Sequence, residues 1–294
     1  VWLEKEGLTR EINSWTFPLH FIDFETSTVA IPFNKDRRPY EGIAFQYSHH
    51  TVDKSGFIEH KGEYISCEQG VFPNYDFLRH LKKELGNDNG TIFRYHNHEN
   101  TYLNLIYQQL QEDSNTISDK EELCDFIKQI TRSTGDIEED WDGGRNMIDL
   151  WVMVKKYYYN PATNGSNSLK DVLPATINSS DYLKNKYSKP IYGSSEMPSL
   201  NFTKKQWLEI QEGIATNPYD RLTEMFDGAQ VYDNLENSED IKDGGAAMIA
   251  YAKMQFEELS DENRKNLRNN LLRYCELDTL AMVMIYEAWK DWLE

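Results

Sequence analysis

The stretch FPLHFIDFE, residues 17–25, is an apolar run that ends in two carboxylates two positions apart. As a β-strand it sends alternate side chains to opposite faces, so Asp23 and Glu25 share one face. Ile22 and Phe24 then point into a core on the other. Burying two like charges is costly unless a cation lies between them. The stretch therefore predicts either a divalent-metal site or a strand end whose carboxylates face water.

The overall charge is strongly acidic. The 294 residues include 31 Lys and Arg against 49 Asp and Glu, a formal net charge of −18. This balance argues against a generic basic nucleic-acid surface. It still permits an enzyme in which metal ions and a few local Lys or Arg side chains hold one phosphate chain. With 39% hydrophobic residues, the chain can bury a substantial core as one large domain.

The cysteines and the start of the chain bear on its cellular setting. Cys67, Cys124 and Cys275 are odd in number and form no CxxC zinc signature or evident disulfide framework, which predicts a reducing cytoplasm. No apolar run is long enough to cross a membrane. The chain starts without an initiator Met or a signal-peptide pattern, so we expect a fragment of a longer protein.

The first half of the chain alternates strand and helix patterns. Three strands joined by short turns predict an antiparallel meander, and a fourth strand follows a helix. The expected elements are a helix or arm over 1–16, strands over 17–25, 43–48 and 56–60, a helix over 71–86, a strand over 91–95, helices over 99–112 and 119–132, and a short strand over 147–150.

The stretch 158–240 is less regular and holds five prolines and many Asn and Ser residues. We interpret it as an excursion from the core, with short helices near 168–173 and 204–214. Within it, the acid-rich segment Asp233–Asp243 is expected to be a solvated loop. The excursion is thus predicted as a helical and irregular insertion.

Two helices are expected after the excursion. One covers about 244–258, and the last runs from an N-cap at Ser260 to about residue 291. The order of elements predicts a mixed α/β sheet with helical cover. In such sheets, sites collect at the carboxyl ends of adjacent strands.

A third carboxylate follows the fourth predicted strand. Glu99 stands at the start of the helix over 99–112, where the helix dipole favours an anion. Because adjacent strands end at one edge of the sheet, we expect Glu99 to lie beside Asp23 and Glu25. The alternative is a carboxylate that only caps the helix.

The final helix carries the sequence LRYCELDT, residues 272–279. Tyr274 and Asp278 are four positions apart and share one helix face. The apolar residues around them predict a buried helix, in which Asp278 needs a partner. That partner is a metal ion, the Tyr274 hydroxyl or a salt link to the N-terminus.

The four carboxylates Asp23, Glu25, Glu99 and Asp278 together offer the oxygen ligands that suit Mg²⁺ or Mn²⁺. Two such ions about 4 Å apart can activate a water and stabilise the leaving oxygen of a phosphodiester. Tyr274 would orient or deprotonate the attacking water. The constellation therefore predicts two-metal phosphodiester hydrolysis.

The DFE strand, Glu99 and the terminal YxxxD resemble motifs one, two and three of the DEDD exonucleases, in the subclass with a motif-three Tyr. These are ribonuclease H-like 3′–5′ exonucleases. The resemblance implies a five-stranded sheet, three antiparallel strands then parallel ones, flanked by helices. It also implies that the four carboxylates bind two Mg²⁺ or Mn²⁺ ions. Most members carry Asp at motif two, and we expect the longer Glu99 to affect rate and metal preference more than fold.

Longer segments resemble a bacterial family known only as a domain of unknown function. They are FIDFET at 21–26, RPYEGIAFQYSHH at 38–50, HENTYL at 98–103, GSNSLKDVLPA at 165–175 and LLRYCELDTLAMVMIYE at 271–287. This resemblance covers nearly the whole sequence and implies a single domain over 1–294. Members often follow a RecB- or Cas4-like nuclease domain in a longer chain, so such a domain is an expected partner.

Several polar residues are candidates for substrate binding. Lys170 lies in a Gly/Ser-rich turn before a helix and could meet a backbone phosphate, as could Arg94. Asn97 and His98 could contact substrate or shape the turn after the fourth strand. An ordinary solvated base is the alternative for Lys170 and Arg94. Asp149 is expected to fix a strand-to-helix turn rather than bind metal.

The expected function is a cytoplasmic metal-dependent nuclease that cleaves single-stranded DNA or RNA from 3′ to 5′. Two alternatives stay open. One is a catalytically impaired nucleic-acid-binding or interaction module, which Glu99 and the acidic charge favour. The other is a hydrolase of small nucleotide phosphodiesters, because an acidic surface suits a small ligand better than a long polyanion.

Overall fold

In the computed structural model, the central sheet has five strands in the order β4-β3-β2-β5-β6. β2 pairs antiparallel with β3, and β3 with β4, whereas β5 joins β2 and β6 joins β5 in parallel. The predicted mixed sheet is therefore confirmed, and it has the ribonuclease H-like arrangement. The strands are β2 (Leu19–Ser27), β3 (Ile43–Val52), β4 (Ile58–Ile65), β5 (Ile92–Arg94) and β6 (Ile148–Asp149).

The structure describes residues 1–115, 117–135, 137–222 and 245–294. Among the helices of these ranges, none has both the length and the apolar character needed to cross a bilayer. The acid-rich segment Asp233–Asp243, predicted as a solvated loop, lies outside the described residues.

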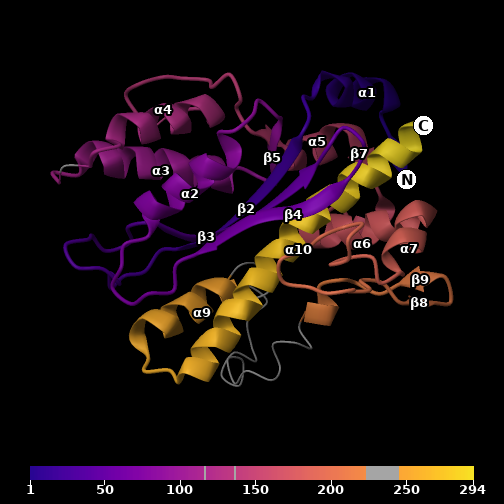
Figure 1. Ribbon diagram of the computed structural model, residues 1–294. Helices are drawn as coiled ribbons and strands as arrows, with labels where there is room; N and C mark the ends of the chain where they lie inside the picture. Colours follow the sequence, from indigo (N-terminus) through magenta and orange to yellow (C-terminus); the bar gives the residue numbers. More distant parts are fainter. Residues whose placement is uncertain (116, 136, 223–244) are drawn as a thin grey trace.

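Helices cover both faces of the sheet (Figure 1). One face packs against α2 (Asn74–Leu85), α3 (His98–Glu112) and α4 (Lys120–Ile130). The other packs against α5 (Leu150–Tyr157), α6 (Leu169–Ser179), α7 (Asp181–Tyr187) and the long α10 (Asp261–Leu293), with α1 (Lys5–Ser14) at its edge. α9 (Gly245–Phe256) packs against β3 and the first half of α10. The helices predicted over 71–86, 99–112, 119–132 and 244–258 are confirmed within a few residues.

Strand β2 sends its side chains alternately into two cores. Leu19 and Phe21 belong to the core beneath α10, and Ile22 and Phe24 belong to the core beneath α2, α3 and α4. By this alternation, the two acidic side chains at 23 and 25 continue the face of Phe21, toward α10. Their predicted common face follows from the strand, and a helix covers that face.

Helix α10 brings the end of the sequence to the middle of the sheet. The Ser260 hydroxyl accepts a hydrogen bond from the Asn263 N–H at 3.2 Å, so the predicted N-cap is confirmed. The helix is 33 residues long, and its second half is buried because it lies between the sheet and α6. Figure 1 shows it crossing the molecule diagonally (yellow). Asp278 therefore lies on a buried stretch of helix, as expected.

The helix predicted near 204–214 is wrong. Residues Ile210–Gln211 (β8) and Ile214–Ala215 (β9) form a small antiparallel hairpin. Glu212 and Gly213 at its tip both have positive φ, 51° and 84°, which a right-handed helix does not permit and a tight hairpin turn requires. Tertiary pairing thus overrides the local helical pattern in this segment.

The rest of the described excursion is more regular than predicted. The short helix expected near 168–173 extends through Pro174 to Ser179 as α6, and α7 follows it directly. Two further short strands, β1 (Trp2–Leu3) and β7 (Tyr158–Tyr159), pair with each other. A single-turn helix (Pro161–Thr163) links β7 to the loop before α6.

Candidate metal centre

The second half of β2 and the middle of α10 meet at Asp23, Glu25 and Cys275. One potential ligand atom of each lies within 4.8 Å of the others. The Cys275 thiol lies 3.5 Å from Asp23 Oδ2, and Glu25 is only 7% exposed. The solvated strand end considered from the sequence is therefore ruled out for Glu25.

Glu99 reaches the same place from the first turn of α3. Its side chain is 1% exposed, and Oε2 is buried without a hydrogen-bond partner. Burial raises the pKa of Glu99 to about 8, although backbone hydrogen bonds at Glu99 and Phe24 and the Arg94 cation act in the opposite direction. An unsatisfied buried carboxylate oxygen is costly, so Glu99 Oε2 is an acceptor that a cation could satisfy.

Asp278 completes the set from α10. It is 8% exposed, and its Oδ1 accepts a hydrogen bond from the Tyr219 hydroxyl at 2.6 Å. Burial raises the pKa of Asp278 to about 6, although Tyr219 and the Lys170 cation lower it. Asp278 thus has a hydrogen-bond partner, Tyr219, that was not predicted from the sequence, and the metal ion expected beside it stays a prediction.

The four carboxylates influence one another directly. Burial raises the pKa of Asp23 well above its ordinary value, and the charges of Asp278, Glu99 and Glu25 raise it further. The pKa of Glu25 is raised by burial and by Asp278, and Lys170 opposes this shift. The four predicted acidic residues, from three elements, therefore lie close enough for the charges of Asp278 and Glu99 to act on Asp23 and Glu25. Among the described residues, Asp23 and Glu25 form the tighter part of this group, with Cys275.

Lys170 and Tyr274 flank this group. Lys170 lies in the first turn of α6, and its Nζ is 5.5 Å from the centre of the Tyr274 ring and 6.0 Å from that of Tyr219. Its cation partly offsets the negative charge of Glu25 and Asp278. Contact between Lys170 and a substrate phosphate stays a prediction.

Arg94 has a structural role, and its predicted contact with substrate stays a prediction. It is 8% exposed, and its guanidinium donates to Asp149 Oδ2 at 2.9 Å and to the carbonyl of His96. Asp149 Oδ1 accepts from the His96 and Trp151 N–H groups, as expected for a residue that fixes the turn into α5. The buried ion pair therefore supports the loop that leads to Glu99.

Asn97 and His98 lie on the outer side of the turn before α3. The Asn97 amide donates to the Thr101 hydroxyl at 3.2 Å. His98 Nε2 is 3.0 Å from Thr26 Oγ1, just beyond the carboxylates of β2, and its ring packs against Tyr102. Within the described residues neither has a hydrogen bond to a carboxylate, and contact with substrate stays a prediction for both.

Two neighbours of the carboxylates were missed from the sequence. Tyr219 lies in the irregular excursion, where no pattern distinguishes it from other aromatic residues. Cys275 lies next to Tyr274 on a helix that the sequence predicts to be buried. That predicted burial was the signal that could have placed Cys275 near the carboxylates. Both contacts join segments that are far apart in the chain.

A second acidic group lies deeper along α10 and differs in character. His60, Glu63 and Glu276 also place potential ligand atoms within 4.8 Å of one another. Glu276, however, accepts hydrogen bonds from the hydroxyls of Tyr192 and Ser199 and from the Asn201 amide. These donors satisfy its oxygens, so we interpret this group as a structural network.

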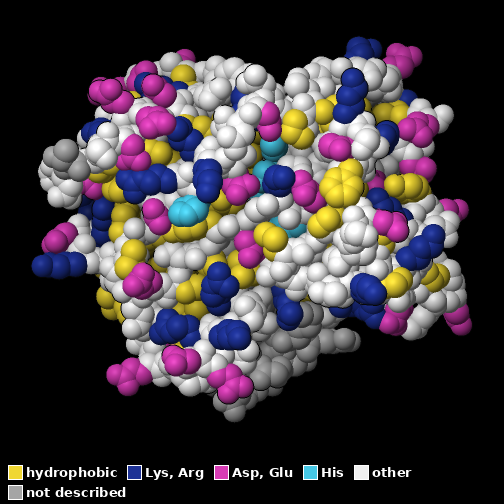
Figure 2. All heavy atoms as spheres, viewed as in Figure 1, with side chains coloured by type: hydrophobic (Ala, Val, Ile, Leu, Met, Phe, Trp, Pro, Cys, Tyr) yellow, Lys and Arg dark blue, Asp and Glu magenta, His cyan; other side chains and the backbone are white. Residues whose placement is uncertain are grey.

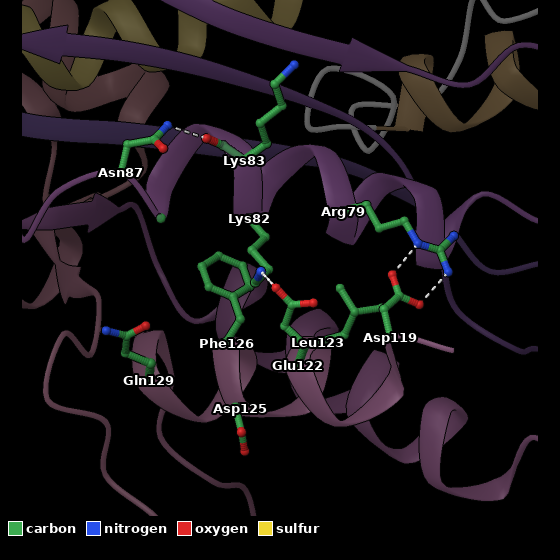
Figure 3. A pocket seen from close by; sticks show the side chains of 11 residues that line it. Arg79, Lys82, Lys83, Asn87, Asp119, Glu122, Leu123, Asp125, Phe126 and Gln129 are labelled. Atoms are coloured by element: carbon green, nitrogen blue, oxygen red, sulfur yellow. Dashed lines mark hydrogen bonds and ion pairs between the residues drawn. The ribbon is translucent and has the colours of Figure 1, made fainter. Parts of the chain in front are cut away.

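A surface hollow of about 710 Å³ lies between α2 and α4 (Figure 3). Four of its charged side chains form ion pairs across it. Arg79 binds Asp119 through two hydrogen bonds of 2.6 and 2.8 Å, and Lys82 pairs with Glu122. The hollow is lined by neither β2 nor α10, so it is separate from the carboxylate group. On the face seen in Figure 2, cationic and anionic side chains are similarly interspersed over the described residues.

The carboxylate group fits a divalent cation. Its donors are mainly carboxylate oxygens, which suit Mg²⁺ and Mn²⁺. Several negative charges are held together under partial burial, and Glu99 Oε2 has no protein partner. A cation among these oxygens would satisfy the charge and the unpaired acceptor together.

The fold and this group define a mixed α/β protein with an acidic centre where β2 ends against α10. Residues 20–168 match the model of a family described as a domain of unknown function, DUF2779. The chain belongs to this family, in agreement with the resemblance to a family of unknown function seen in the sequence. No curated protein and no solved structure matches the chain.

Proposed function

We propose that this protein is a metal-dependent nuclease that hydrolyses phosphodiester bonds of DNA or RNA, from 3′ to 5′ on single strands. The observation that carries the proposal is the convergence of Asp23, Glu25, Glu99 and Asp278 under burial, with Glu99 Oε2 unpaired. The DEDD exonucleases, which the sequence motifs resemble, use four carboxylates contributed in the same chain order. The ribonuclease H-like sheet agrees with that resemblance.

The residues divide into three chemical roles. The four carboxylates would hold Mg²⁺ or Mn²⁺, which when bound supplies water activation and stabilises the leaving oxygen. Tyr274, one turn before Asp278 on α10, would orient the attacking water through its hydroxyl. Lys170 would neutralise part of the phosphate charge and keep the scissile group near the acidic side chains.

The direct test is degradation of end-labelled single-stranded DNA and RNA with Mg²⁺ or Mn²⁺. We expect the wild-type chain to shorten them from the 3′ end and the double variant Asp23→Ala/Asp278→Ala to lose this activity. The matched control is Asp76→Ala/Asp181→Ala, which removes two carboxylates whose side chains are 59% and 92% exposed. Equal activity of the wild type and the site variant would overturn the proposal.

The substrate length separates the nuclease from the alternatives. Cleavage of dinucleotides without cleavage of oligonucleotides would indicate a hydrolase of small nucleotide phosphodiesters. Carboxylate-dependent Mn²⁺ binding without cleavage of either would indicate an interaction module that retains the centre. Label position distinguishes 3′–5′ polarity from the reverse.

A further inference from the structure

Tyr219 connects the excursion to the candidate metal centre. Its hydroxyl donates to Asp278 Oδ1 at 2.6 Å, and its ring lies 6.0 Å from Lys170 Nζ. The pKa of Tyr219 is raised well above its ordinary value by burial and by the charges of Asp278, Tyr274 and Asp23. The phenol is therefore surrounded by residues of the centre, although it belongs to a different part of the chain.

The backbone around Tyr219 is anchored at several points. The Asn217 carboxamide oxygen accepts from the Tyr219 N–H at 3.1 Å and forms a local turn. On the strand just before it, the Ala215 N–H donates to Asn178 Oδ1 on α6 at 2.8 Å. Leu222, just after it, is buried in the core beneath α10. These contacts fix the direction in which the phenol points.

Helix α6 anchors this segment and also carries Lys170. In Figure 1, α6 and the β8–β9 hairpin lie on the same side of α10, and both pairs of elements, α6 with β9 and α6 with α10, are in contact. The excursion thus supplies a hydrogen-bond donor and a cation to one carboxylate. A surface insertion without a role in the centre would not be expected to place both Tyr219 and Lys170 beside Asp278.

We propose that Tyr219 is a positioning residue that orients the Asp278 carboxylate for a divalent cation. The excursion over 158–240 would then contribute to metal binding. The inference rests on the metal-binding part of the proposed function. A carboxylate oxygen has two lone pairs, so it can accept the phenol and still bind a metal. Hydrogen-bond partners of this kind orient metal ligands, and their loss typically weakens metal affinity about 10–100-fold.

The test compares Mn²⁺ binding by calorimetry for wild type, Tyr219→Phe and Tyr182→Phe. Tyr182 is a matched control, because its hydroxyl donates to Glu287 on the same helix, at 2.9 Å and away from the centre. We expect Tyr219→Phe to weaken Mn²⁺ binding about tenfold or more and Tyr182→Phe to leave it unchanged. Equal affinity of Tyr219→Phe and wild type would overturn the inference.

A second measurement needs no metal. In EDTA, the thermal midpoints of Tyr219→Phe, Asp278→Ala and the double variant form a double-mutant cycle. We expect the two single effects to be non-additive, because they remove the same hydrogen bond. Strictly additive effects would show that the contact is not formed in solution and would also overturn the inference.

The failures of the two proposals have different signatures. A wild-type chain that binds no Mn²⁺ would overturn both the positioning role and the nuclease proposal. Mn²⁺ binding that depends on Tyr219, without cleavage of any nucleic acid, would overturn the nuclease proposal and support the positioning role. Nuclease activity with Mn²⁺ binding indifferent to Tyr219→Phe would overturn the positioning role alone.

Discussion

The thiol of Cys275 lies 3.5 Å from the Asp23 carboxylate, across 252 positions of sequence. This contact joins the middle of β2 to the middle of α10 and closes the acidic centre between them. Neither segment has all of the ligands by itself. The centre therefore exists only when the last helix is packed on the first long strand, so its chemistry and the stability of the fold are linked.

In the absence of metal, Glu99 should destabilise the protein. Its buried carboxylate, whose pKa is raised to about 8, is more costly to ionise in the folded state than in the unfolded chain. We expect Glu99→Gln, in EDTA near pH 8, to stabilise the fold by on the order of 2 kcal/mol, or roughly 4 °C in Tm. Calorimetric or fluorescence melting measures this shift.

The control for this variant is Glu112→Gln on the same helix, whose side chain is 61% exposed. Its Tm should stay within about 1 °C of wild type, because exposed charges contribute little. A lower Tm for Glu99→Gln than for wild type would mean that the ionised carboxylate is well accommodated without a cation.

Metal addition should stabilise the wild-type protein through the candidate metal centre. A ligand that binds only the folded state stabilises it by about 2.7 kcal/mol at a concentration of 100 times Kd. We expect Mn²⁺ to raise the Tm of wild type and to leave that of Asp23→Asn nearly unchanged. Thermal melting across a Mn²⁺ titration measures both responses.

Glu63→Gln is the matched control for the metal response. Glu63 belongs to the second acidic group, and its Oε2 already accepts from the Asn201 amide at 2.6 Å. This variant should retain the full Mn²⁺ shift. If it loses the shift while Asp23→Asn keeps it, the cation binds at the His60–Glu276 group instead.

The sequence predicts the centre better than it predicts the surroundings of the centre. The alternation along β2 is a local property, so the common face of Asp23 and Glu25 followed from a period of two. The place of Glu99 followed from the rule that sites form where adjacent strands end. The contact of Tyr219 with Asp278 could not be predicted from the sequence. The direction of the Tyr219 side chain depends on the contact of the preceding β8–β9 hairpin with α6 and on the burial of Leu222.

Arg94 illustrates the same limit from the other side. As a lone base beside an acidic motif, it suggested contact with a phosphate. Its partner Asp149 is 55 positions away and becomes a neighbour only when β6 pairs with β5. An ion pair that forms only when two distant strands pair leaves no periodic pattern in the sequence. A single sequence therefore does not distinguish an Arg that pairs with a buried Asp from an Arg that binds a phosphate.

Acid should weaken the fold through His20. This histidine is 2% exposed, and its pKa is lowered from 6.5 to about 4, first by burial and then by His49. Because the folded-state pKa is the lower one, the unfolded chain binds more protons between pH 6.5 and 4. The contribution of neutral His20 is therefore complete above pH 6.5 and falls as the pH drops toward 4.

The measurement compares urea unfolding of wild type and His20→Gln at several pH values. From neutral pH to about pH 4, wild type should lose up to about 3 kcal/mol relative to the variant, because one pKa unit corresponds to about 1.4 kcal/mol. His80→Gln serves as the control, since His80 is exposed on α2. A gap between wild type and His20→Gln that is constant with pH would contradict the assignment.

The ion pair between Arg94 and Asp149 should stabilise the fold more than an exposed pair of the same kind. The side chains are 10% and 12% exposed, and Asp149→Asn would keep the turn acceptor while leaving a buried guanidinium without its counter-charge. We expect a loss of about 3 kcal/mol in the free energy of unfolding, since breaking a buried pair is costly. The control is Asp119→Asn, which removes the charged partner of Arg79, a side chain that is 42% exposed. This change should lower the free energy of unfolding by under about 1 kcal/mol. Equal losses in urea unfolding of the two variants would mean that water screens the Arg94 pair as effectively as the surface pair.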